Sequence, residues 1–106
     1  TGEDTLSLHD ALPILADLVK ELMSFSINVH LVDPYASPNE VAHEYGLTLM
    51  DSPSDQYDAV IVSVGHQHYK ELTIDYFKSI MNGTPILMDL KGMYQNNDSK
   101  ITYWRL

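Results

Sequence analysis

Cysteine is absent from this chain of 106 residues. Its absence excludes disulfides, thiolate nucleophiles and thiolate metal sites within these residues, and it is typical of proteins from a reducing cytoplasm. Basic side chains are scarce, with six Lys and Arg against fifteen Asp and Glu and a formal charge of −9. Duplex DNA and anionic membrane surfaces are therefore poor partners. A phosphate-bearing ligand would have to rely on backbone amides and one or two local cations.

Long apolar runs and familiar catalytic motifs are missing as well. No stretch approaches the roughly 20 apolar residues that span a bilayer, and no basic segment followed by an apolar one opens the chain as a signal peptide would. We therefore expect a soluble cytoplasmic protein. The dinucleotide motif G-x-G-x-x-G, the Walker loop, G-x-S-x-G and the His-Glu metal motif do not occur. The sequence predicts no catalytic residue, and its length allows one domain at most.

The most regular feature that is present is a strand followed by a helix in the middle of the chain. Residues 59–64 form a nearly continuous apolar run rich in β-branched side chains. Such a run predicts a strand that is buried on both faces, in the middle of a sheet. Gly65 interrupts it, and the apolar spacing after Tyr69 is helical. In open α/β sheets a junction of this kind contributes to a ligand crevice.

Further strands and helices alternate on both sides of this junction. Apolar spacing, cap residues and prolines predict helices at 13–25, 38–45 and 69–81 and strands at 27–32, 47–50, 59–64, 85–88 and 101–106. Residues 5–8 fit either a short strand or a capping box made by Ser7 and Asp10. Strands alternating with helices predict an α/β fold of three layers, Rossmann-like, with a mostly parallel sheet.

A parallel sheet also predicts which loops lie close together. The carboxyl ends of its strands share one edge, where ligands of open α/β folds bind. The loops that follow these strands are Asp33-Pro34-Tyr35, Gly65-His66-Gln67-His68 and Asp89-Leu90-Lys91-Gly92. They supply carboxylates, imidazoles, a lysine and glycines to one crevice of nucleotide size.

Each of these side chains has an ordinary structural interpretation beside the functional one. Asp33 is placed to accept a hydrogen bond from a ribose hydroxyl, but an aspartate before proline is also common turn chemistry. His66 and His68 have the chemistry of metal ligands or acid–base groups, yet two histidines without a nearby carboxylate more often cap a helix, so we expect no metal site. Lys91 is either an anion-binding group or a solvated surface lysine.

The ordered segments VHLVDPYASPNEVAHEYGL, YDAVIVSVGHQHYKEL, ILMDLKGMY and YWRL carry a resemblance to a known family. Together, over roughly residues 16–106, they resemble the C-terminal domain of the UDP-glucose/GDP-mannose dehydrogenase family, in its branch acting on UDP-N-acetylhexosamines. The resemblance implies a Rossmann-like UDP-binding domain. It also implies a parent enzyme, a homodimer or higher oligomer, that oxidises the sugar C6 alcohol to a carboxylate in two NAD-dependent steps through a catalytic cysteine.

The resemblance also implies roles for single residues. Asp89, Lys91 and Gly92 match the family's aspartate, basic residue and glycine after a late strand, and the resemblance implies that Lys91 reaches the UDP-sugar. Asp33, Gly65 and His66 are then expected to line the cleft. The catalytic cysteine and the NAD fingerprint have no counterpart here, so NAD is expected to bind the parent enzyme and not this chain.

The first 14 residues depart from the family pattern. The family has a Phe-Lys loop, an Asp-Arg turn and its first, central strand before the first helix, whereas this chain has TGEDTLSLHDALPI. That string resembles translated sequencing-adapter sequence; an ordinary polar N-terminus is the alternative. We therefore expect a non-family segment at 1–14 and a nucleotide-sugar-binding domain at 15–106 that lacks its central strand.

Loss of a central strand leaves backbone N–H and C=O groups of its two neighbouring strands without hydrogen-bond partners. Each such buried group costs on the order of 1 to 3 kcal/mol, against the roughly 5 to 15 kcal/mol that stabilises a whole domain. We therefore expect weak folding or association through the open sheet edge. A different class of function, a non-enzymatic regulatory or interaction domain of flavodoxin-like design, would explain the missing catalytic motifs. It would not explain the ordered segments DPY, GH and DLKG.

Overall fold

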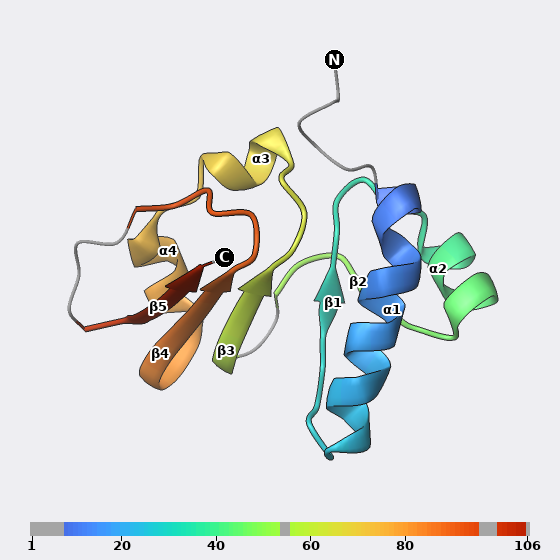
Figure 1. The fold of residues 1–106 in the computed structure, drawn as a ribbon, viewed down its shortest axis with the longest axis horizontal. Helices are drawn as coiled ribbons and strands as arrows, with labels where there is room; N and C mark the ends of the chain where they lie inside the picture. Colours follow the sequence, from blue (N-terminus) through green and yellow to red (C-terminus); the bar gives the residue numbers. More distant parts are fainter. Residues whose placement is uncertain (1–7, 54–55, 96–99, 106) are drawn as a thin grey trace. The chain divides into compact units, whose positions relative to one another are not determined.

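The computed structural model describes residues 8–53, 56–95 and 100–105, which belong to two compact units (Figure 1). We call residues 8–53 the N-terminal unit and residues 56–95 with 100–105 the C-terminal unit. Each unit contains parallel strands and helices. The expected α/β class with parallel sheets is thereby confirmed. None of the helices in these stretches has the length and apolarity that crossing a membrane requires.

The N-terminal unit contains two helices and a sheet of two strands. These are α1 (Leu8–Ser24), β1 (Leu31–Val32), α2 (Pro38–Tyr45) and β2 (Leu49–Met50), and β1 pairs with β2 in parallel. Helix α2 begins as predicted, because the Ser37 hydroxyl accepts a hydrogen bond from the Glu40 amide at 3.3 Å. It ends at Gly46, whose φ of 67° is the left-handed conformation that glycine adopts at little cost. The core of the unit consists of Ala16, Val19, Val41 and Leu47.

Two predictions for this unit are wrong in their boundaries. Helix α1 begins at Leu8 and not at Pro13. The prediction took the preference of proline for a first turn as a boundary, but helix formers such as Leu12 extend the helix on its N-terminal side. The strands are also shorter than predicted, since only two residues of each enter the ladder. Of the strand predicted at residues 5–8 and the alternative capping box of Ser7 and Asp10, residues 5–7 lie outside the described residues, whereas Leu8 and Asp10 belong to α1.

The C-terminal unit is a parallel sheet of three strands with two helices. Its elements are β3 (Tyr57–Val62), α3 (Gln67–Lys70), α4 (Ile74–Ser79), β4 (Met81–Asp89) and β5 (Thr102–Arg105). The strand order is β3-β4-β5, and both pairs are parallel. Val62 is in register with Asp89, which is in register with Arg105, so the three strands end at the same edge.

The strand orders match a doubly wound fold without its first strand. Dinucleotide-binding sheets have the order 3-2-1-4-5-6. The order β2-β1 corresponds to strands 3 and 2 of that pattern, and the order β3-β4-β5 corresponds to its strands 4, 5 and 6. No strand among the described residues corresponds to its strand 1. Strand β3 is therefore an edge strand of its sheet. The expected weak folding or self-association stays a prediction; a sharp two-state melt of a monomer in size-exclusion light scattering would contradict it.

The predicted burial of the central strand is wrong for part of β3. Val62 and Val64 are buried, but Val60 and Ile61 are half-buried and Ala59 is exposed. The apolar run predicted neighbours on both sides and layers on both faces. A strand at a sheet edge lacks one of those neighbours, so its β-branched side chains keep contact with water.

The helix predicted at 69–81 is also wrong, because the structure has two shorter helices there. Thr73 separates them, since its hydroxyl accepts a hydrogen bond from the Tyr76 amide at 3.1 Å and so caps α4. Apolar residues at i and i+4 continue across this break, which is why the spacing indicated one helix. Asn82 and Gly83, which directly follow the predicted helix, belong to β4.

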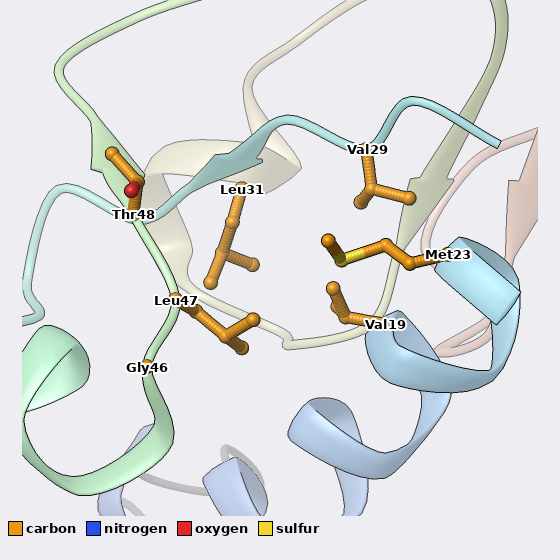
Figure 2. Close-up of a pocket in the computed structure, with 7 residues that line it drawn as sticks. All are labelled: Val19, Met23, Val29, Leu31, Gly46, Leu47 and Thr48. Atoms are coloured by element: carbon orange, nitrogen blue, oxygen red, sulfur yellow. The ribbon is translucent and has the colours of Figure 1, made fainter. Parts of the chain in front are cut away.

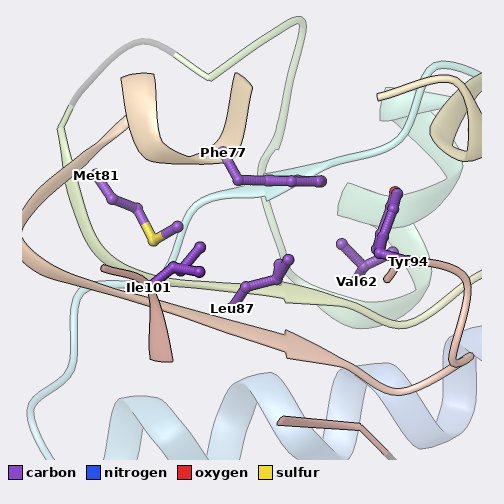
Figure 3. Close-up of a cluster of buried hydrophobic side chains, with 6 residues drawn as sticks. All are labelled: Val62, Phe77, Met81, Leu87, Tyr94 and Ile101. Carbon is purple, nitrogen blue, oxygen red and sulfur yellow. The ribbon is translucent and has the colours of Figure 1, made fainter. Parts of the chain in front are cut away.

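One face of the three-stranded sheet carries the core of the unit (Figure 3). Leu87 of β4 is completely buried there, and the rings of Phe77 and Tyr94 meet edge to face at 5.1 Å. The core cluster consists of Val62, Phe77, Met81, Leu87, Tyr94 and Ile101. The other face is more open, with Ile86 and Trp104 at 38% and 47% exposure. Side chains alternate along a strand, so Asp89 lies on the same face as Leu87, at the end of this core.

Candidate functional site

A small pocket in the N-terminal unit is not the expected nucleotide site. Its volume is about 140 Å³, and Figure 2 shows that the side chains of Val19, Met23, Val29, Leu31 and Leu47 face one another around it. Its complete lining is Val19, Met23, Val29, Leu31, Gly46, Leu47 and Thr48. Thr48 is the only polar side chain in that lining, whereas a nucleotide needs several convergent polar groups. The pocket is a gap in the packing of α1 on the sheet.

The predicted site residues that the structure brings together lie where β3 and β4 end. The Leu90 amide donates to the Val62 carbonyl at 2.9 Å, which fixes the loop after β4 beside the end of β3. A Cβ on Gly65 would lie 4.0 Å from Cγ of Lys91 and 3.7 Å from the sulfur of Met93. The backbone at Gly65 and the aliphatic stem of Lys91 are therefore neighbours, as expected for loops at one edge of a parallel sheet.

Asp89 is the polar centre of this edge. It is completely buried, and its Oδ1 accepts from the Lys91 amide at 3.2 Å. Its Oδ2 accepts from the Tyr94 amide at 2.9 Å and from the Tyr103 hydroxyl at 2.6 Å. No buried side-chain nitrogen or oxygen lacks a hydrogen bond in the part of the chain that the structure describes. A buried carboxylate with these donors is well satisfied, and it fixes the path of the turn from Lys91 to Tyr94.

Two tyrosines complete this network, and the sequence interpretation missed both. The Tyr94 hydroxyl donates to the Tyr69 carbonyl at 2.5 Å, and the Tyr103 hydroxyl also approaches the Tyr94 carbonyl at 2.8 Å. Tyr94 opens the polar stretch YQNNDSK, which predicts a loop and not a buried side chain. Alternation along the last strand could have placed Tyr103 on the core face, but its contact with Asp89 depends on the strand register.

Burial and the neighbouring carboxylate hold both phenols in their neutral form. Burial, followed by the hydrogen bond to Asp89, raises the pKa of Tyr103 to about 12. Burial and the charge of Asp89 raise the pKa of Tyr94 well above its usual range. Both tyrosines therefore remain hydrogen-bond donors at neutral pH, and the turn keeps one conformation.

Lys91 is exposed in the turn, and Gly92 beside it is half-buried. The Gly92 amide donates to the Asp89 carbonyl at 3.3 Å, and Gly92 has a φ of 64°. Nη2 of Arg105 donates to the Gly92 carbonyl at 3.1 Å. Glycine is needed here for the backbone conformation, and a Cβ on Gly92, 2.5 Å from that nitrogen, would also displace the guanidinium of Arg105. Lys91 thus belongs to the turn whose Gly92 carbonyl binds Arg105.

The histidines after β3 lie at the entry to α3. His66 is buried, it occupies the N-cap position, and its carbonyl accepts from the amides of Tyr69 and Lys70 at 3.0 and 3.3 Å. Its side chain makes no cap hydrogen bond, so His66 occupies the expected N-cap position without the expected side-chain capping. The ring of His68 lies 5.9 Å from that of Tyr69. The described residues contain no group of three or more His, Cys, Asp or Glu placed to hold a metal ion.

Asp33 belongs to the N-terminal unit, where it closes a turn. Its side chain is buried, and its Oδ1 accepts from the Tyr35 amide at 2.7 Å. This is the ordinary turn chemistry of an aspartate before proline. A role of Asp33 in lining the cleft stays a prediction, as does direct contact of Asp89, Lys91 or Gly92 with a ligand.

Comparison with known proteins relates this chain to one protein family. Residues 13–96 match the UDP-glucose/GDP-mannose dehydrogenase family, UDP binding domain. The chain is 37% identical over 88 residues to a UDP-N-acetyl-D-glucosamine 6-dehydrogenase of Salmonella typhi and 31% identical over 88 residues to one of Pseudomonas aeruginosa. Each match covers 82% of this chain and 21% of the relative. Protein CapL of Staphylococcus aureus is 29% identical over 92 residues, which are 84% of this chain and 22% of CapL.

The chain thus spans about a fifth of the length of these relatives. No solved structure matches it significantly. The family match includes both edge loops, with Gly65 and His66 after β3 and Asp89 to Gly92 after β4. The chain belongs to the UDP-glucose/GDP-mannose dehydrogenase family and represents its UDP-binding domain.

Proposed function

We propose that this chain binds the UDP part of a nucleotide sugar, with Lys91 as the side chain that contacts the ligand. The observation that carries the proposal is the turn after β4. A buried carboxylate holds its backbone through Lys91 and Tyr94, and Lys91 lies at the carboxyl edge of a parallel sheet, exposed and beside Gly65. Because the backbone of this turn is held, binding a diphosphate through Lys91 would order little more than the lysine side chain itself.

We further propose that the chain is part of an NAD-dependent dehydrogenase that oxidises the C6 alcohol of a UDP-N-acetylhexosamine to a carboxylate. The names of the relatives from Salmonella and Pseudomonas support this substrate class. In this proposal the enzyme is cytoplasmic, forms a homodimer or higher oligomer, and supplies precursors of polysaccharides. NAD and the catalytic cysteine belong to other parts of that enzyme, since this chain has no cysteine and no dinucleotide motif.

Calorimetric titration of the 106-residue chain with UDP, UDP-N-acetylglucosamine and NAD tests the proposal. We expect UDP and the UDP-sugar to bind with similar affinity, because the sugar contacts lie largely in other domains, and NAD not to bind. Lys91→Ala is expected to weaken UDP binding about tenfold, the effect of one charge-assisted contact.

Lys78→Ala serves as the matched control. Lys78 lies in the last turn of α4, just before β4 begins, and therefore at the opposite end of that strand from Lys91. UDP binding that Lys91→Ala leaves intact would remove Lys91 from the site. No binding of any UDP compound would contradict the function and favour the interaction domain of flavodoxin-like design.

A further inference from the structure

The position of Arg105 makes it a neighbour of the Lys91 turn. Arg105 ends β5 and is in register with Asp89, which ends β4. The strands are parallel, so the side chain of Arg105 leaves the sheet at the edge that carries Lys91 and Gly92. It is the only arginine in the sequence.

The guanidinium of Arg105 is held by one hydrogen bond and has further N–H donors. Its Nη2 donates one hydrogen bond, to the Gly92 carbonyl at 3.1 Å, and the side chain is exposed. A guanidinium carries five N–H donors in a planar fork. Contact with the turn therefore holds the group in place and leaves donors directed away from that carbonyl.

The charge of Arg105 has no carboxylate partner among the described residues. The nearest candidate by register is Asp89, but its oxygens accept from the Lys91 amide, the Tyr94 amide and the Tyr103 hydroxyl. Lys91 forms no ion pair within the same described residues either. Lys91 and the Gly92 carbonyl that binds Arg105 thus belong to one turn, in a chain with a formal charge of −9. An anion that reached both charged groups would be attracted by each of them.

We propose that Arg105 is a second phosphate-binding cation of the site and acts with Lys91 on the same diphosphate. The inference rests on the proposed UDP binding and adds a residue to it. A diphosphate offers two anionic groups, which suit one point charge and one planar fork: Lys91 supplies the first and Arg105 the second.

The single arginine allows a direct test in the unchanged chain. In a ¹⁵N correlation spectrum the Nε–H group of Arg105 gives one signal that no other arginine overlaps. We expect UDP to shift this signal and uridine, which has no phosphate, to leave it in place. Backbone amide shifts on UDP addition without a shift of the Arg105 signal would overturn this inference and leave the proposed function intact. The absence of any shift on UDP addition would overturn both.

A substitution gives the second test. Arg105→Gln removes the charge but keeps a side-chain N–H that is able to donate to the Gly92 carbonyl. We expect it to weaken UDP binding about tenfold and UMP binding less, because one charge-assisted contact with the diphosphate is lost. Lys78→Gln, which removes the same charge at the other end of β4, is expected to change UDP affinity less than twofold. An Arg105→Gln chain that binds UDP as tightly as the unchanged chain would overturn the inference.

Discussion

Asp89 is predicted to stabilise the fold through the turn that it holds. Asp89→Asn keeps the size of the side chain but replaces one accepting oxygen by an NH₂ group. Whichever way the amide points, the amide of Lys91 or of Tyr94 loses its acceptor. A buried donor without a partner costs about 1 to 3 kcal/mol, and the hydrogen bonds that remain are weaker without the charge. We expect the free energy of unfolding to fall by about 1.5 to 3 kcal/mol.

Urea denaturation followed by circular dichroism measures this loss. With an m-value of about 1.5 kcal/mol/M, the midpoint should fall by roughly 1 to 2 M. Asp58→Asn is the control, because Asp58 is exposed on β3, and its midpoint should change by less than about 0.3 M. Equal midpoints for Asp89→Asn and the unchanged chain would refute the role of Asp89 in holding the turn.

Three further predictions concern the C-terminal unit, to which Asp89 belongs. Stability should decrease as the pH rises from 10 to about 12, because Tyr103 binds its proton more tightly in the folded chain than in the unfolded chain. Tyr103→Phe should make this alkaline loss of stability smaller. An equal loss in the variant would contradict the raised pKa of Tyr103. Gly92→Ala and Gly83→Ala should both lower the urea midpoint, because both glycines have positive φ, and only Gly92→Ala should also displace the guanidinium of Arg105 and shift its Nε–H signal; an unchanged Arg105 signal would argue against that contact. Leu87→Ala should cost about 2 to 5 kcal/mol of unfolding free energy, and Ile86→Ala, on the open face, clearly less; similar losses would mean that the core does not lie where we place it.

Local sequence rules predicted the elements with clear end signals. Ser37 and Gly46 bound α2 as expected, and the apolar runs at 59–64 and 85–88 lie in or beside parallel strands. The strand ends in turn predicted that Gly65 and Lys91 would be close, and the structure confirms that proximity. Rules of this kind succeed where the determining atoms are within a few residues of each other.

The errors occur where distant contacts decide the structure. Thr73 starts a new helix inside a continuous apolar spacing, and β3 is more exposed than its composition predicts because it has a neighbour on one side only. The burial of Asp89 depends on Tyr94 and Tyr103, which reach it through the path of a loop and the register of β5. The position of Arg105 on Gly92 depends on the same register. No local pattern contains that information.

The central claim is that the turn after β4 and the loop after β3 form the UDP site. Titration of the ¹⁵N-labelled chain with UDP, followed through backbone amide signals, tests it most directly. We expect saturable shifts that are largest at Gly65, Lys91 and Gly92, three residues at the carboxyl edge of the sheet. Shifts that leave these three amides unchanged and appear elsewhere, such as around the apolar pocket beside Thr48, would contradict it.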